Sequence, residues 1–277
     1  MLEQQASKTA LGVAYIRAAH QILDTAPLLF EDPVALPLLG PNALEAIRAT
    51  RERHQSPYGR GLRSHVCLRS RFTEDMLQRS GANRYVLVGA GFDTFALRQP
   101  DGAKGLRILE VDHPATQAAK RERIAAAGFA LPEKVRFAAT DFARENLADI
   151  LGREKIAAEE TVFFSWLGVT MYLSDAAIDT SLAAMARAAE HTAVCLTFKQ
   201  PDDGLVAGDK AMADSVAALG EAFVSFFTPD QMAAKLQQHG FTHPEFLTPE
   251  RALAEYYTPP RGGLPPPRKT GIVYAAT

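Results

Sequence analysis

The stretch Tyr85-Val86-Leu87-Val88-Gly89-Ala90-Gly91-Phe92-Asp93-Thr94 decides the fold. Its first four residues are apolar or aromatic and predict a buried strand that runs into a glycine turn. Gly89 and Gly91 let the backbone turn sharply and let a ligand come close to the main chain. Because a tight strand-to-helix turn without a ligand has the same pattern, this stretch alone does not define a binding site.

Short apolar runs of the same kind recur along the chain, with helical stretches between them. Helices are predicted over residues 114–127, where Pro114 suits the first position, and after Ser174, a favourable N-cap. This alternation is typical of a parallel α/β sheet. The predicted strands cover residues 85–89, 107–112, 135–139, 162–166 and 193–198, a segment near Phe246, and residues 271–275.

Two acids follow predicted strands in this part of the chain. Asp112 ends the second strand, 21 positions after Gly91. Since the tips of neighbouring strands flank the crevice of an open α/β sheet, Asp112 can accept hydrogen bonds from both hydroxyls of a ribose. Asp141 follows the third strand, where it can accept from an adenine amine while Phe142 packs on the ring. The alternative for Asp141 is the N-cap of a helix over residues 143–147.

The glycine turn also indicates which nucleoside is bound. The third glycine of the dinucleotide fingerprint is replaced by Thr94, and no G-x-x-x-x-G-K-[ST] motif is present. A ligand with a ribose but no phosphate therefore fits best, and S-adenosylmethionine is the common one. An NAD-dependent oxidoreductase is a disfavoured alternative.

The sequence resembles the leucine carboxyl methyltransferase family of class I S-adenosylmethionine-dependent methyltransferases, especially its bacterial branch of small-molecule O-methyltransferases. The resemblance covers residues 9–189, and the ordered series of motifs is more specific than any one of them. The motifs are Arg69-Ser70-Arg71-Phe72 with Asp75, Gly89-Ala90-Gly91-Phe92-Asp93-Thr94, Glu110-Val111-Asp112-His113-Pro114, Asp141-Phe142, and Leu167-Gly168-Val169-Thr170-Met171-Tyr172-Leu173.

The resemblance implies roles for individual residues. Arg69 looks like the family arginine that pairs with the methionine carboxylate of the cofactor, a contact that a planar guanidinium makes bidentately. The glycines look like the turn against the amino acid part, Asp112 like the ribose ligand and Asp141 like the adenine ligand. Leu167 departs from the family, where many relatives have a glutamate that holds the cofactor's ammonium. In this chain a backbone carbonyl or another acid must then hold the ammonium. Phe95 stands where relatives often have arginine.

Composition excludes several classes of protein. The 277 residues are 47% hydrophobic and 22% charged with a net charge of −2, which excludes disordered and fibrous chains and predicts no general attraction to nucleic acid or membranes. The longest apolar run, residues 162–173, is too short to span a bilayer. No signal peptide is recognisable, and Cys67 and Cys195 have apolar neighbours, as buried thiols of a reducing compartment do. We therefore expect a cytoplasmic protein.

Residues 48–71 carry seven arginines and one acid, Glu52. The alternatives are a solvated or internally paired helix face, an entrance for an acidic small molecule and, least favoured, an RNA contact, since no nucleic-acid motif appears. His239 and His243 are four apart, but Gly240 and Pro244 break the helix that a zinc pair needs, so no metal is predicted.

Methyl transfer from a sulfonium depends mostly on alignment and on the exclusion of water. A carboxylate acceptor needs only a positioning cation, for which Arg63 and Arg71 are candidates. A phenol or alcohol needs a general base, for which His113 and Tyr172 are candidates, although His113 is more simply an N-cap. The catalytic residue is otherwise unknown from sequence, and no oligomeric state is indicated.

Our hypothesis is an α/β, Rossmann-like class I methyltransferase with a seven-stranded, mostly parallel sheet, helices on both faces and an antiparallel last strand. A single domain is expected over residues 1–277, divided into a helical N-terminal cap (1–82), a cofactor-binding core (83–200), a lid insertion (201–228) and a C-terminal helix with edge strands (229–277). The expected reaction is O-methylation of a small-molecule carboxylate or hydroxyl. The runner-up is a non-catalytic module that binds the same cofactor.

Overall fold

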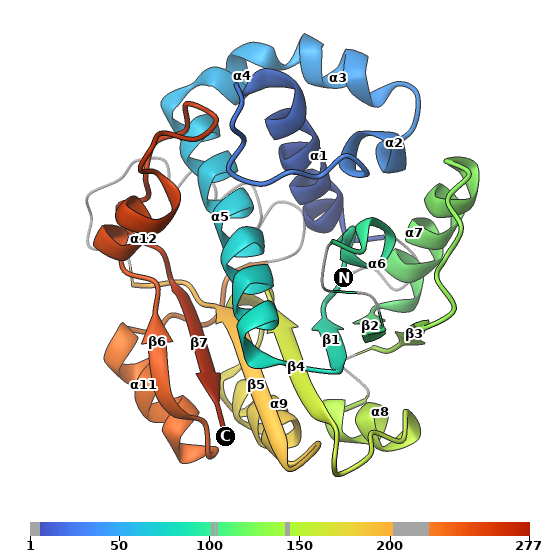
Figure 1. The fold of residues 1–277 in the computed structure, drawn as a ribbon, viewed down its shortest axis with the longest axis vertical. Helices are drawn as coiled ribbons and strands as arrows, with labels where there is room; N and C mark the ends of the chain where they lie inside the picture. Colours follow the sequence, from blue (N-terminus) through green and yellow to red (C-terminus); the bar gives the residue numbers. More distant parts are fainter. Residues whose placement is uncertain (1–5, 101–102, 104, 142–144, 202–221) are drawn as a thin grey trace.

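Seven strands form one sheet in the order β3-β2-β1-β4-β5-β7-β6 in the computed structural model, which describes residues 6–100, 103, 105–141, 145–201 and 222–277 (Figure 1). Strands β1 to β5 are parallel to one another, whereas β7 is antiparallel to both β5 and β6. The predicted sheet, including its antiparallel last strand, is confirmed. The strands are β1 (Arg84–Val88), β2 (Arg107–Asp112), β3 (Val135–Ala139), β4 (Thr161–Trp166), β5 (His191–Thr197), β6 (Thr242–Phe246) and β7 (Ile272–Ala276).

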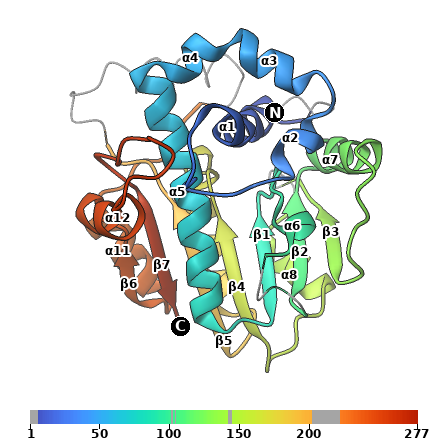
Figure 2. The ribbon, with the colours of Figure 1, turned by 45° about the horizontal axis from the view of Figure 1, so that its top comes forward.

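Helices cover both faces of this sheet (Figures 1 and 2). One face packs against α5 (Pro57–Ser80), α6 (Phe95–Arg98) and α12 (Pro249–Tyr256). The other packs against α8 (Leu147–Arg153), α9 (Asp175–Ala186) and α11 (Pro229–Gln238). Because successive side chains of a strand point to opposite faces, Tyr85 and Leu87 join the core on the α5 side, and Val86 and Val88 join the core on the α9 side.

Local sequence signals fix most helix ends. The Ser56 hydroxyl accepts from Gly59 N at 3.0 Å ahead of α5, and Gly81 ends that helix with φ +65°. Ser174 caps α9 as predicted, and α7 (Pro114–Ala126) matches the predicted helix. Helix α12 was not predicted, although Thr248 caps it and Pro249 begins it, which is a recognisable start signal.

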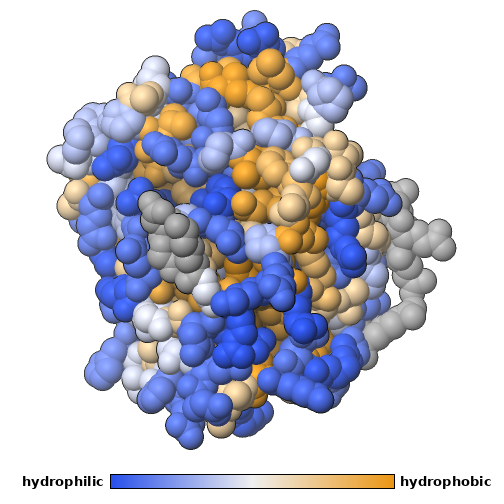
Figure 3. Space-filling model, turned by 45° about the vertical axis from the view of Figure 1, so that its right-hand side comes forward, coloured by the Kyte–Doolittle hydropathy of each residue, from blue (hydrophilic) through white to orange (hydrophobic). Residues whose placement is uncertain are grey.

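The N-terminal segment is helical and lies above the carboxyl ends of the strands; we call it the cap (Figure 2). Its helices are α1 (Lys8–Leu23), α2 (Ala35–Leu39), α3 (Ala43–Ala49) and α4 (Arg51–Gln55). Ala14, Ala18 and Ile47 of the cap share one hydrophobic cluster with Phe92, which follows β1, and with Ile124 of α7. Figure 3 shows that hydrophobic surface gathers in the upper half of this side of the molecule, where the cap lies.

Several smaller expectations can be compared with the structure. Cys67 and Cys195 are buried and free, as predicted. His239 bonds Asp179 at 2.8 Å, and no cluster of metal-ligating side chains occurs in the described part of the chain. Within the same residues, no helix is long and apolar enough to cross a membrane. Most of the predicted lid insertion, residues 202–221, lies outside the described residues.

Candidate active site

A cavity of about 780 Å³ opens at the carboxyl ends of β1, β2, β3 and β4. This is the switch point of the sheet, since the chain continues from β1 to β2 and β3 on one side and later returns to β4 and β5 on the other. Its size is within the usual range for small-molecule sites. The start of α1 forms one wall, and Ala222 and Val224 contribute to another.

The glycine turn lines the cavity and adopts conformations that favour glycine. Gly89 has φ +72° and Gly91 has φ +52°. A Cβ atom on Gly89 would lie 2.3 Å from Cγ2 of Val169, and one on Gly91 would lie 3.1 Å from Cβ of Ala10. The two glycines therefore let the turn pack against the neighbouring chain as well as face a ligand, a reason that the sequence did not show.

Asp112 reaches the cavity from the end of β2. Its Oδ2 accepts from Gly91 N at 2.5 Å, and its Oδ1 accepts from His113 N at 2.6 Å. Burial raises the pKa of this carboxyl, while the two backbone N–H groups act in the opposite direction. Each carboxylate oxygen keeps a further lone pair, so the pair of oxygens can still accept from two hydroxyl groups.

Asp141 also lines the cavity, and Phe142 lies outside the described residues. The alternative role of Asp141 as a helix cap does not hold for α8, because Asn146 caps that helix through Asp149 N at 3.0 Å. Asp112 and Asp141 thus lie at the ends of adjacent strands, β2 and β3, as the sequence predicted.

Arg69 enters the cavity from α5 and lies against the turn after β4. A Cβ atom on Gly168 would lie 2.9 Å from Nη1 of Arg69. The side chain is partly exposed, yet protein surrounds it closely enough that burial, followed by repulsion from Arg17, lowers the pKa of its guanidinium to about 10. Its guanidinium has no hydrogen-bond partner among the described residues. A cation held in this way favours an anionic ligand group.

The candidate catalytic residues both line the cavity. Nδ1 of His113 accepts from Ala115 N at 3.3 Å, so this histidine caps α7. Because Nδ1 is an acceptor, the proton of the neutral ring is on Nε2, and this tautomer makes His113 a poor general base. The Tyr172 ring lies 5.4 Å from that of Phe223, and Leu167 also lines the cavity.

Arg63 and Arg71 are not among the lining residues, in contrast to the expectation that they position the acceptor. Nε and Nη2 of Arg63 each donate to Asp24 at 2.7 Å, and its side chain is only 1% exposed. Arg71 donates to both oxygens of Asp75, at 3.0 and 3.1 Å. In Arg63 these bonds, with one from Nη1 to His54 O at 2.6 Å, engage all three nitrogens, whereas in Arg71 they engage only Nε. For these two arginines, the internally paired alternative describes the structure.

Sequence reasoning missed several lining residues. Arg17 and Asp93 are joined by a hydrogen bond of 3.1 Å, and Asp93 was quoted only as part of a motif. Ser7, Thr140 and Ser165 also reach the cavity. The position of Asp93 two residues after the glycine turn is a usable signal, whereas nothing in the helical pattern of α1 distinguishes Arg17 as a lining residue.

A model of the family described as leucine carboxyl methyltransferase matches residues 10–186. The chain belongs to this family. A relative from Bacillus subtilis (strain 168) named "Putative S-adenosyl-L-methionine-dependent methyltransferase YktD" is 29% identical over 281 residues, which cover 90% of this chain and 91% of the relative. Together they confirm the predicted class of enzyme: this is an S-adenosylmethionine-dependent methyltransferase.

Solved structures support the fold of this methyltransferase. The "putative methyltransferase" of Thermobifida fusca YX has a TM-score of 0.55 at 16% identity and covers 96% of each chain. The "putative O-methyltransferase" of Nostoc punctiforme PCC 73102 has a TM-score of 0.52 at 12% identity, over 96% of this chain and 67% of that one. At these identities the likeness concerns the fold alone.

Proposed function

We propose that this methyltransferase methylates an oxygen atom of a small-molecule carboxylate. The observation that carries the proposal is the cavity at the carboxyl ends of the strands, which combines Arg69, a guanidinium without a hydrogen-bond partner in the described part of the chain, with carboxylates at two neighbouring strand tips. The family to which the chain belongs is named after the methylation of a carboxyl group, which supports an oxygen acceptor.

The cavity residues fit the cofactor. Arg69 would bind the methionine carboxylate, since a guanidinium pairs with a carboxylate through two hydrogen bonds. Asp112 would accept from the ribose hydroxyls with its free lone pairs, and Asp141 from the adenine amine. Gly89 and Gly91 provide main chain without side chains along the same wall.

When bound, the cofactor would supply a methyl group attached to a positively charged sulfur, and an ionised acceptor oxygen would bond to the methyl carbon as the carbon–sulfur bond breaks. The protein then contributes mainly alignment and the exclusion of water. Val169, Tyr172 and Val224 line the cavity and would keep water from the acceptor. A carboxylate is already ionised near neutral pH, so this reaction needs no general base.

The state of His113 supports a carboxylate over a hydroxyl acceptor. A phenol or alcohol must lose a proton, and His113 uses its only acceptor nitrogen to cap α7. Tyr172 is the remaining candidate base, and a carboxylate acceptor would need neither residue in that role.

The test is incubation with S-adenosylmethionine carrying a labelled methyl group and a panel of carboxylic acids, phenols and alcohols. Mild base releases labelled methanol from a methyl ester but not from an ether, so base-labile product supports the proposal. Base-stable product would assign a hydroxyl acceptor and overturn it. Binding of the cofactor by calorimetry without transfer to any acceptor would favour the non-catalytic module, and binding of NAD in its place would favour an oxidoreductase.

A further inference from the structure

The amino acid end of S-adenosylmethionine carries two opposite charges, and the proposed function assigns only its carboxylate, to Arg69. The following inference rests on that proposed function. The ammonium needs an acceptor close to Arg69, and Leu167, which lines the cavity there, has only an aliphatic side chain. Among the described residues, the aspartates and glutamates that line the cavity are Asp93, Asp112 and Asp141.

Of these three, Asp93 is the one whose charge acts on the Arg69 guanidinium and favours its charged form. Both side chains line the same cavity, and Asp93 follows β1, the strand next to β4. Asp112 and Asp141 are at the ends of β2 and β3, whereas Arg69 lies against the turn after β4, on the other side of β1. The two strand-tip acids are therefore placed for the nucleoside, and Asp93 is placed for the amino acid end.

The Asp93 carboxylate has room for another donor. Its Oδ2 accepts from Arg17 Nη1 at 3.1 Å, and its Oδ1 accepts from Phe95 N at 2.7 Å. Each oxygen therefore keeps a lone pair, and the side chain is 22% exposed. Burial raises the pKa of this carboxyl, but Arg17, Lys120 and Arg98 together bring it below the ordinary value, so Asp93 is ionised at neutral pH.

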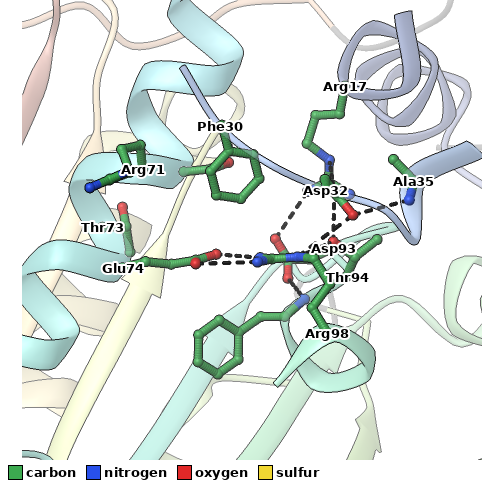
Figure 4. A network of polar contacts seen from close by, with 12 residues as sticks. Arg17, Phe30, Asp32, Ala35, Arg71, Thr73, Glu74, Asp93, Thr94 and Arg98 are labelled. Carbon is green, nitrogen blue, oxygen red and sulfur yellow. Dashed lines mark hydrogen bonds and ion pairs between the residues drawn. The ribbon is translucent and has the colours of Figure 1, made fainter. Parts of the chain in front are cut away.

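A network of charges holds Asp93 in this position (Figure 4). Arg17 comes from α1 and also donates to Phe92 O at 2.5 Å, while its Nε lies 3.5 Å from Asp32 Oδ2. Asp32 accepts from the Thr94 hydroxyl at 2.7 Å. The turn on both sides of Asp93 is thus fixed to the N-terminal cap.

The same network includes a second arginine, Arg98, and a third acid, Glu74. Arg98 of α6 donates to Glu74 of α5 and to the Thr94 hydroxyl, the latter at 3.0 Å. Two arginines, Arg17 and Arg98, face the three acids Asp32, Glu74 and Asp93. Asp32 is fully buried, and of the three acids only Asp93 lines the cavity. Asp93 is therefore the carboxylate that this network presents to the cavity.

We propose that Asp93 binds the ammonium group of the cofactor, in the role that Leu167 cannot fill, and that Arg17 is the residue that positions it. Arg69 and Asp93 then form a matched pair of charges for the zwitterionic end of the ligand. This assignment concerns binding, so it can be tested without knowing the methyl acceptor.

The test compares three ligands by calorimetry on the full chain. S-adenosylhomocysteine has both charged groups, decarboxylated S-adenosylmethionine keeps the ammonium but lacks the carboxylate, and 5′-methylthioadenosine has neither. Asp93→Asn keeps the shape and the bond from Phe95 N, but it removes the charge. Because charge-assisted hydrogen bonds are the strong ones, we expect at least tenfold weaker binding of the first two ligands and a change within twofold for the third.

Three further variants make the result specific. Arg69→Met should weaken S-adenosylhomocysteine at least tenfold but leave decarboxylated S-adenosylmethionine within twofold. Glu74→Gln, which removes an acid of the same network outside the cavity, should leave all three affinities within twofold. In the Asp93→Asn background, Leu167→Glu should recover binding of the two ligands that have an ammonium.

Two outcomes would overturn the inference, and a third would refute the proposed function. An unchanged affinity of Asp93→Asn for the ammonium ligands would mean that backbone carbonyls hold this group. An equal loss for all three ligands would mean that Asp93 only maintains the turn. A wild-type protein that binds none of the ligands would instead refute the proposed function itself, so the two failures are distinguishable.

Discussion

Gly89→Ala isolates the contact that shapes the glycine turn. At φ +72° an alanine costs about 1–2 kcal/mol because its Cβ crowds the backbone in the left-handed region. Its Cβ would also lie 2.3 Å from Cγ2 of Val169, a short β-branched side chain that cannot turn away freely. Overpacking of this kind adds about 1–3 kcal/mol. We therefore expect the free energy of unfolding to fall by about 2–5 kcal/mol.

The two contributions separate in a Val169→Ala background. Loss of Cγ2 leaves the new Cβ with contacts of about 3.6 Å or longer in this direction, so Gly89→Ala should then cost only the backbone share of about 1–2 kcal/mol. Gly128→Ala is a matched control, since Gly128 has φ +73° and no atom within 4 Å of its new Cβ. Its cost should equal the backbone share.

Urea unfolding followed by tryptophan fluorescence measures these costs, because Trp166 is the single tryptophan and is buried in β4. A cost of Gly89→Ala that is the same with Val169 and with Ala at position 169 would refute the steric argument. A cost of Gly128→Ala as large as that of Gly89→Ala would refute it as well, since only the backbone conformation would then matter.

Three further predictions concern other charged residues. Asp112→Ala should weaken S-adenosylmethionine binding at least tenfold in calorimetry with an unchanged circular dichroism spectrum, since two ribose hydroxyls lose a charged acceptor; an unchanged affinity would remove the ribose assignment. Arg63→Met should lower the free energy of unfolding by about 3–5 kcal/mol, because it leaves Asp24 buried without its bidentate partner, yet cofactor affinity should stay within twofold; a selective loss of affinity would return Arg63 to the site. Burial raises the pKa of Glu110 to about 6, so the native state keeps a proton that the unfolded state loses from about pH 4.5. Stability should therefore fall by about 1.3 kcal/mol as the pH rises from 4.5 to 6, and the double variant Glu110→Gln, Lys120→Met should lack this slope in urea titrations at the two pH values.

The sequence predicted the parts of the site that depend on local pattern. Strand ends are marked by the change from apolar residues to glycine or acid, so Gly89, Gly91 and Asp112 could be placed at one edge of the sheet. Arg63 shows why other residues could not be placed. Its partner Asp24 is 39 positions away, and only tertiary structure reveals that the pair uses up the guanidinium donors.

The same distinction between local pattern and tertiary contact explains why sequence reasoning did not place Arg17 and Asp93 in the site. A sequence shows that charged residues are present, but it does not show that residues 76 positions apart meet beside a cavity. Nothing in the sequence around Arg17 indicates that its side chain turns toward the glycine turn. Helix α12 is different, because Thr248 and Pro249 are a local start signal that could have been used.

The charged network under the cap contributes to the site mainly through geometry. Buried ion pairs add little net stability, because the cost of removing both charges from water offsets their attraction, but removal of one partner leaves a buried charge that costs about 3–5 kcal/mol. Arg17 therefore does more to restrict where α1 can lie than to hold the fold together. Cβ of Ala10 in the same helix lies 3.1 Å from the position that a Cβ atom on Gly91 would occupy. The cap and the glycine turn thus specify each other's position, so residues 83–200 alone do not contain the complete wall of the cavity.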